Sequence, residues 1–235
     1  MDRERETPIW VFVAAGCGSL VVLSIVGVVL LGYMGYRWTR EVESRLRDPA
    51  VRSRETLKIL GCDRVPNGYH AGGGFSLPLV MDVAVLTDRE PDAQGAVRGF
   101  DRRGFIYVRM LRFGPEQQQL RDFFEGKQDD PEALRATGIR LGRREVLRRG
   151  ALDAQGARLL YVAQRGRLDA HETRIEALTT LILVECPDDE QWRLGIWFGP
   201  DPTVGRTQAE ADLSGSPADE AAILAFMAHF SLCKD

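Results

Sequence analysis

The sequence predicts an α+β fold: a single transmembrane helix at the N-terminus, followed by an antiparallel sheet flanked by helices. Three observations lead to this prediction. One long run of residues carries no charge, several segments alternate between apolar and polar residues, and the last apolar segment has helical spacing. The 235 residues suit one domain of ordinary size. No strand–helix–strand rhythm is present, so the sheet is expected to be antiparallel.

The first element is a predicted membrane span. Thirty residues between Glu6 and Arg37 carry no charge, and about 20 apolar residues in a helix cross a bilayer core. A cleaved signal peptide would have a shorter apolar core and a small-residue exit, so we expect an uncleaved signal anchor. The sequence therefore divides into an N-terminal tail (1–8), a transmembrane helix (9–36), a juxtamembrane helical stalk (37–60) and a single α+β globular domain (61–235).

Two opposing signals in the sequence bear on which side of the membrane the globular domain lies. Arginines are more frequent after the span than before it, which by itself favours a cytoplasmic domain. Long domains, however, translocate largely regardless of charge, and three cysteines in the domain suit an oxidising space. We expect a single-pass membrane protein with an extracytoplasmic domain.

Strands and helices follow in order within the domain. Asp48, Pro49 and Gly61 bound a short helix at the end of the stalk. Alternating segments at 75–88 and 104–113 predict strands, and a helix begins at Pro115. Two predicted hairpins pair 144–152 with 157–164 and 173–186 with 192–199. The final helix starts around Ser216 and covers the sheet with an apolar face.

One resemblance accompanies these elements. A loop with Pro66, Gly68 and Tyr69, the meandering strands and the Phe-rich C-terminal helix are similar to PsbP-like α+β domains, over residues 61–232. The resemblance implies that the chain has an accessory or assembly role rather than a catalytic one.

The cysteines supply candidate covalent and metal sites. Cys62 and Cys233 lie where helices enter and leave the domain, so a Cys62–Cys233 disulfide is the favoured pair, with free thiols as the alternative. His229 and Cys233 could join Cys186 and Cys62 around zinc. Structural zinc sites usually combine two closely spaced ligand pairs, and only one such pair is present. We therefore predict neither a metal site nor a cofactor.

Two further clusters are candidate binding sites. His70, Gly72, Gly73, Gly74 and Trp197 could line a ligand groove, although Trp197 also suits a core position. A second cluster is a candidate anion-binding patch, with an ordinary charged outer sheet face as the alternative; it consists of Arg143, Arg144, Arg148 and Arg149.

The expected function follows from the predicted anchor and domain together with the lack of a recognisable catalytic motif. No nucleophile elbow or P-loop accompanies the histidines, so no catalytic residue is assigned. We expect a membrane-anchored, non-catalytic binding, accessory or scaffold module. The alternative is a membrane-tethered hydrolase or thiol-dependent enzyme using His70 or His171.

The expected partners follow from charge and from the predicted anchor. The bilayer is the partner of residues 9–36, and a protein partner or a homodimer formed through the anchor is a further hypothesis. Small residues at 14, 18, 15 and 19 permit close helix pairing. A net charge of −3 disfavours nucleic acid.

Overall fold

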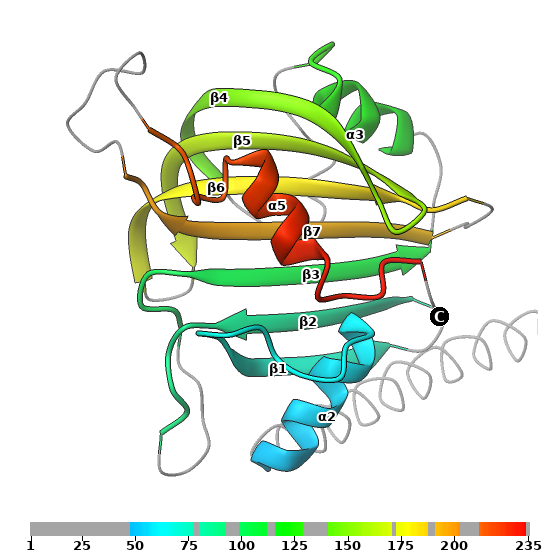
Figure 1. Ribbon diagram of the computed structural model, residues 1–235, viewed down its shortest axis with the longest axis vertical. Coiled ribbons are helices and arrows are strands. Elements are labelled where there is room, and N and C mark those ends of the chain that lie inside the picture. Colours follow the sequence, from blue (N-terminus) through cyan, green and yellow to red (C-terminus); the bar gives the residue numbers. More distant parts are fainter. Residues whose placement is uncertain are drawn as a thin grey trace, which may run out of the picture. The chain divides into compact units, whose positions relative to one another are not determined.

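The computed structural model describes residues 48–77, 80–92, 99–111, 116–128, 141–170, 173–187, 191–202 and 212–233. In this part of the chain, seven strands form one antiparallel sheet in the order β1-β2-β3-β7-β6-β5-β4 (Figure 1). The strands are β1 (His70–Leu77), β2 (Met81–Thr87), β3 (Gly104–Leu111), β4 (Leu141–Ala154), β5 (Ala157–Ala170), β6 (Thr173–Glu185) and β7 (Gln191–Pro200). The helices are α2 (Pro49–Leu60), α3 (Glu116–Phe124) and α5 (Glu220–Met227).

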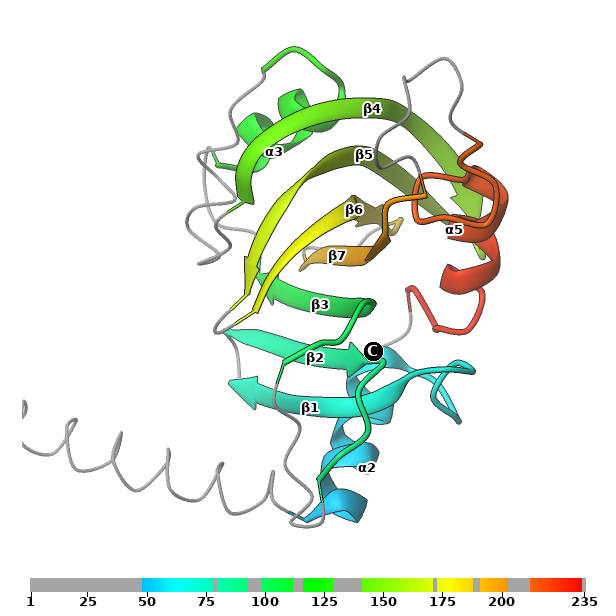
Figure 2. The same cartoon turned by 90° about the vertical axis from the view of Figure 1, so that its left-hand side faces the viewer.

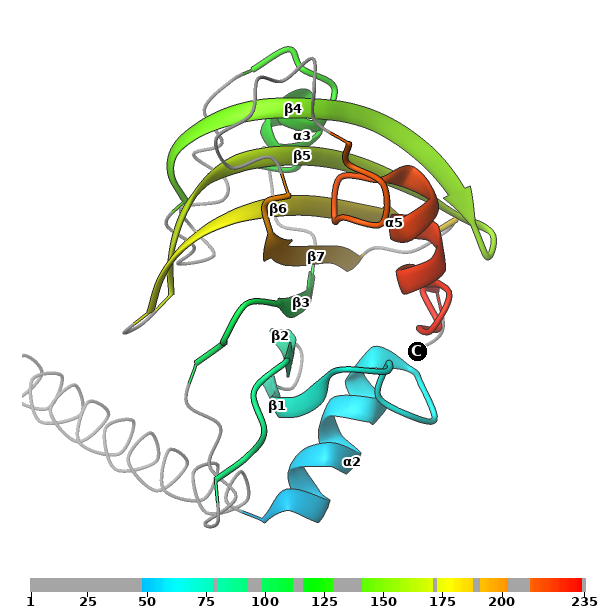
Figure 3. The same cartoon turned by 60° about the vertical axis from the view of Figure 1, so that its left-hand side comes forward.

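The sheet consists of two meanders joined by one non-local pairing. Strands β1 to β3 form the first meander, and β4 to β7 form the second. Strands β3 and β7 pair antiparallel, with Arg109 opposite Arg193 and Phe105 opposite Trp197. The long strands β4 and β5 curve strongly, as Figures 2 and 3 show from two sides. The pairing of β3 with β7 brings residues 80 to 94 positions apart onto neighbouring strands.

Both predicted hairpins are present, and the first has a tight two-residue turn. Strands β4 and β5 pair from Ala154 opposite Ala157 onward. The two residues between them, Gln155 and Gly156, have positive φ angles of 51° and 78°. Two-residue turns of this kind match the twist of the strands that they connect. Strands β6 and β7 form the second predicted hairpin.

Alternating side chains build a core on each face of the sheet. One face packs under α2 and α5, where Phe105, Tyr161 and Ile182 meet Ile223 and Phe226. The opposite face packs under α3, whose inward residues are Leu120, Phe123 and Phe124. Helix α5 crosses its face of the sheet in Figure 1. Successive residues of a strand point to opposite faces, so neighbouring residues contribute to different cores.

Helix α2 has the ends that the sequence predicts. The Asp48 carboxylate accepts hydrogen bonds from the backbone N–H groups of Ala50 and Val51. Gly61 ends the helix in the left-handed region at φ 61°, where glycine carries no steric penalty. The helix lies against β1, with Gly74 beneath Thr56. Helix α5 is capped by Asp219, three residues later than the predicted start at Ser216.

The predicted α+β fold class is wrong. The described residues are mostly one seven-stranded antiparallel sheet, accompanied by helices of only 12, 9 and 8 residues. Strands β4, β5 and β6 have 13 or 14 residues each, well above the usual strand length of about 5 or 6. The strands therefore dominate this part of the chain, and the short helices only cover its faces.

The membrane predictions are corrected as well. Among the described residues, none of the helices combines the length and apolar character needed to cross a bilayer. The longest, α2, has 12 residues, which reach about 18 Å against a hydrocarbon core of about 30 Å. A single-pass transmembrane protein with a membrane location is therefore not supported. The predicted tail, the span 9–36 and the first part of the stalk lie outside the described residues.

Candidate functional site

A pocket lies at the end of the sheet where β1 turns into β2, β3 ends and β7 begins. Its volume is about 170 Å³, and we call it the sheet-end pocket. The residues that line it are Leu77, Val80, Met81, Asp82, Arg109, Met110, Leu111 and Gln191. The strand register places the Asp82–Arg109 pair on one face of the sheet and the Met81–Met110 pair on the other. Ligand sites are typically concave and mostly apolar, with a few placed polar groups. The sheet-end pocket has this composition.

An ion pair holds the polar part of the sheet-end pocket. Asp82 on β2 lies directly opposite Arg109 on β3. The Arg109 Nε and Nη2 atoms both donate to Oδ2 of Asp82, at 2.8 Å and 2.7 Å. The two side chains are only 20% and 19% exposed. Arg109 makes further interactions, whereas Oδ1 of Asp82 accepts no hydrogen bond within the described part of the chain.

The rim of the sheet-end pocket is apolar and exposed. Val80 is 51% exposed, and its backbone N–H closes the turn by donating to the Leu77 carbonyl at 2.9 Å. Met81 and Met110 lie opposite each other on β2 and β3. Methionine side chains are flexible and adapt to the shape of a bound group. The rim therefore combines the exposed Val80 side chain with adaptable methionine side chains.

Arg193 is a third charged residue in line with Asp82 and Arg109, and the three form a charged row across β2, β3 and β7. It lies opposite Arg109 on β7 and is only 2% exposed, and it interacts with other groups of the protein. Asp82, Arg109 and Arg193 are not among the site residues predicted from the sequence. Each is a charged residue at an inward position of an alternating strand, and that departure from the pattern was the available signal.

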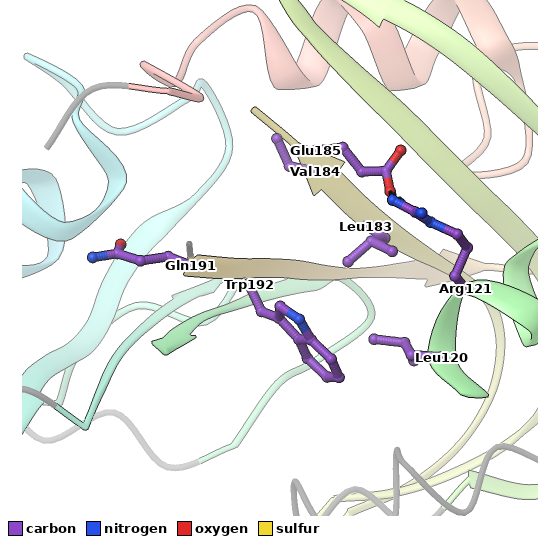
Figure 4. Close-up of a pocket in the computed structure, with 7 residues that line it drawn as sticks. All are labelled: Leu120, Arg121, Leu183, Val184, Glu185, Gln191 and Trp192. Carbon is purple, nitrogen blue, oxygen red and sulfur yellow. Dashed lines mark hydrogen bonds and ion pairs between the residues drawn. The ribbon is translucent and has the colours of Figure 1, made fainter. Parts of the chain in front are cut away.

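A second hollow lies under α3 and has room for about one water molecule. Its volume is about 10 Å³. Figure 4 shows Arg121 of α3 reaching the Glu185 carboxylate, with Leu120 and Trp192 beside them. Arg121 Nε donates to Oε1 of Glu185 at 3.0 Å. This ion pair ties α3 to β6, and the hollow is too small for an organic ligand.

The residues of the predicted ligand groove lie in packed surroundings. Trp197 is 8% exposed, stacks on Phe226 at 4.4 Å between ring centroids and donates from Nε1 to the Tyr69 hydroxyl at 2.8 Å. Gly74 lies under α2, where an added Cβ would be 3.0 Å from the Thr56 backbone nitrogen. His70 begins β1 opposite Thr87. Trp197 thus takes the core position, which the sequence favours for it over a groove.

Gly72 and Gly73, the other members of that predicted groove, serve the local shape of β1. A Cβ at Gly72 would lie 3.0 Å from a Val85 methyl group on β2. The pairing register with β2 shifts between Ala71 and Gly73, which is the mark of a β-bulge. The glycines therefore permit an irregular, closely packed strand.

The cysteines pair differently from the prediction. The disulfide joins Cys186 to Cys233, with 5.5 Å between the Cα atoms, and Cys62 is a free thiol. The segment after α5 runs past the end of β6, which brings Cys233 to Cys186 instead of to Cys62. Burial, together with a smaller contribution from the negative charge of the nearby Asp63, raises the pKa of Cys62 from its ordinary value of 9.0 to about 11.

The zinc candidate loses two of its donors to that disulfide. Cys186 and Cys233 are bonded to each other, and Nδ1 of His229 lies 3.0 Å from the Ala225 carbonyl of its own helix. No cluster of three His, Cys, Asp or Glu residues suited to a metal ion occurs among the residues described.

The predicted anion patch is divided between the two faces of the sheet. Arg148 is exposed opposite Ala163, whereas Arg149 lies opposite Val162 and stacks over the Phe123 ring of α3 at 5.7 Å. The side chains of Arg143 and Arg144 lie outside the described part of the chain, although their backbone belongs to β4. His171 also lies outside it.

Comparisons with known proteins assign no family. Neither a scan against protein-family models nor a search of curated proteins returned a match. The resemblance to PsbP-like domains stays a prediction.

Proposed function

We propose that this domain is a non-catalytic binding module and that the sheet-end pocket is its ligand site. The observation that carries the proposal is a largely buried ion pair, Asp82 with Arg109, in a concave site with an apolar, exposed rim. Large exposed apolar side chains are few here: among the described residues they are Val80 and Val146. Val80 lines the sheet-end pocket.

The enzyme alternative has weaker geometric support. The His70 side chain makes no hydrogen bond or ion pair within the described residues, so no nucleophile is placed beside it. The raised pKa of Cys62 keeps its sulfur protonated at neutral pH, whereas thiol enzymes depend on a thiolate. We therefore favour binding over catalysis.

The test uses the methionines as reporters and a substitution at the rim. In protein with ¹³C-labelled methionine methyl groups, a library of small organic fragments is added at millimolar concentration. We expect binders to shift the signals of Met81 and Met110 in the NMR spectrum. The signal of Met227, which is fully buried in the core, should stay unchanged.

Val80→Trp should abolish these shifts, because the indole fills the mouth of the pocket while the substituted position is exposed and tolerant. Val146→Trp is the matched control, since Val146 is also an exposed apolar residue but lies on β4 at the opposite edge of the sheet. A library in which no fragment shifts Met81 and Met110 would overturn the proposal.

A further inference from the structure

We infer that the outer edge of β4 is an interface between two copies of this chain, which pair antiparallel through residues 148–154 with a two-fold axis at Ala151. This interface is independent of the sheet-end pocket, because β4 lies at the far edge of the sheet from β1 and β2. Three features of β4 point to it: its place in the sheet, the direction of its backbone groups, and the order of its charges.

The last half of β4 is a regular strand at the outside of the sheet. Among the described elements, β4 packs against β5 and makes a smaller contact with α5, whereas α2 packs against the other outermost strand, β1. Figures 2 and 3 show β4 as the outermost strand of its meander. Residues 148–154 pair with β5 in an unbroken register, and both register shifts of β4 lie before Arg148. Bulges protect a sheet edge from pairing, so this protection ends where the regular segment begins.

The turn between β4 and β5 fixes which backbone groups point outward. Ala154 and Ala157 flank its two residues, and in such a hairpin the flanking residues exchange both backbone hydrogen bonds. Bonded and non-bonded pairs alternate along an antiparallel ladder, so the N–H and C=O groups of residues 149, 151 and 153 point away from β5. The side chains of Ala151 and Asp153 are exposed. The edge therefore presents backbone groups to another strand at regular two-residue intervals.

The charges of this segment are ordered so that it complements itself. Arg149 and Asp153 project from the same face of β4, each two residues from Ala151. With the axis at Ala151, Arg149 lies opposite the partner's Asp153, and symmetry repeats the pair. Opposite charges on directly opposed residues stabilise an antiparallel pair. Within its own chain Asp153 lies opposite Arg158, so in the dimer this carboxylate stands between two arginines.

Other alignments of the two strands lose this match. An axis at Arg149 places the two copies of Arg149 opposite each other, and an axis at Asp153 opposes the two aspartates; like charges directly opposed are destabilising. An axis at the neighbouring positions 150 or 152 places Ala151 opposite a charged residue and pairs no opposite charges. The charge pattern thus selects the alignment centred on Ala151, and it makes a second copy of this chain the strand that fits.

The shared segment is short, so the dimer should be in equilibrium with the monomer. Interfaces below about 1,200 Å² are characteristic of weak association. Analytical ultracentrifugation of the full chain, from about 10 μM to about 1 mM, should show a dimer whose share rises with concentration. A monomer at every concentration would overturn the inference.

A cysteine at the axis reports the alignment directly. In Ala151→Cys the two introduced side chains lie opposite each other, with about 5.5 Å between Cα atoms, so mild oxidation should link them. Mass spectrometry of the peptides distinguishes this link from links through Cys17 or Cys62. Gln155→Cys is the matched control, because position 155 is exposed at the end of the same strand but its two copies would be about 26 Å apart. A link between the two copies of position 155, with none at 151, would contradict the alignment.

Asp153→Arg should raise the dissociation constant of the dimer at least about tenfold, because two attractive pairs become repulsive. Adding Arg149→Asp should restore most of the affinity, since each pair is then reversed. Glu90→Arg makes the same charge change at an exposed position in the loop after β2 and should leave the dissociation constant unchanged. Equal weakening by Asp153→Arg and Glu90→Arg would reduce the effect to net charge and overturn the inference. Circular dichroism shows whether each variant is folded, and the link at position 151 decides the question if a charge variant is not.

Discussion

At the scale of single residues, burial sets the pKa of the free thiol Cys62. Cys62 follows the end of α2 and is packed against the core that also contains Cys186. Burial disfavours the thiolate, and its pKa rises to about 11. The folded state therefore holds this proton more tightly than the unfolded state. The resulting contribution to stability is complete below the unfolded pKa near 9 and is lost as the pH rises through 11.

The alkylation rate of Cys62 should follow this pKa. At pH 8 the thiolate fraction should be about a hundredfold lower than for a thiol with an ordinary pKa, since each pKa unit is a factor of ten. Iodoacetamide labelling of the Cys62 peptide, measured by mass spectrometry from pH 7 to 11.5, should still be rising at pH 10. The urea-unfolded protein is the control, and its labelling rate should have its midpoint near pH 9. A folded-state midpoint near 9 would contradict the burial argument.

At the scale of elements, the contact between α2 and β1 depends on a missing side chain. Gly74 faces α2, and a Cβ there would approach the Thr56 backbone nitrogen to 3.0 Å and its Cα to 3.1 Å. Backbone atoms cannot rotate away as a flexible side chain can, so the helix itself would have to move. The small residue thus sets the distance between helix and sheet.

Gly74→Ala should therefore lower the free energy of unfolding by about 1 to 3 kcal/mol through overpacking. Urea denaturation at 25 °C measures the change. Ser76→Ala, two residues along the same strand at an exposed position, is the matched control and should have an effect of less than about 0.5 kcal/mol. A gain in stability at position 74, as expected where alanine only reduces unfolded-state entropy, would show that α2 has room to adjust.

At the scale of the whole described domain, the disulfide closes the fold. Cys186–Cys233 spans 47 residues and ties the segment after α5 to the end of β6. A cross-link of this span stabilises a protein mainly by restricting the unfolded chain, and the chain-entropy model gives about 4 kcal/mol. The link encloses β7 and α5, which contribute to both cores.

Reduction of the disulfide should lower the midpoint of urea denaturation, and Cys186→Ala with Cys233→Ala should reproduce the loss without reductant. The expected decrease is about 2 to 5 kcal/mol. Cys62→Ala is the control, because a free thiol should leave the response to reductant unchanged. If instead that variant alone removed the response, Cys62 would belong to the disulfide, as the sequence analysis had predicted.

Local patterns were sufficient for the elements but not for the site. The caps at Asp48 and Gly61, the alternating strands and the two hairpins depend on residues close together in the chain, so they could be predicted. The strand content was underestimated, because β4 (Leu141–Ala154) and β5 (Ala157–Ala170) extend beyond the predicted strands 144–152 and 157–164. The prediction of a membrane span drew on residues 1–47, which the structure does not describe.

By itself, the sequence determined the two hairpins and where α2 begins and ends. The predicted strand 75–88 is instead divided between the end of β1 and β2. Only the tertiary structure decided the β3–β7 pairing, the row formed by Asp82, Arg109 and Arg193, and the choice of Cys186 as the partner of Cys233. The physical reason is distance along the chain. Periodicity and capping act over a few residues, whereas these contacts join segments that meet only after both cores are packed.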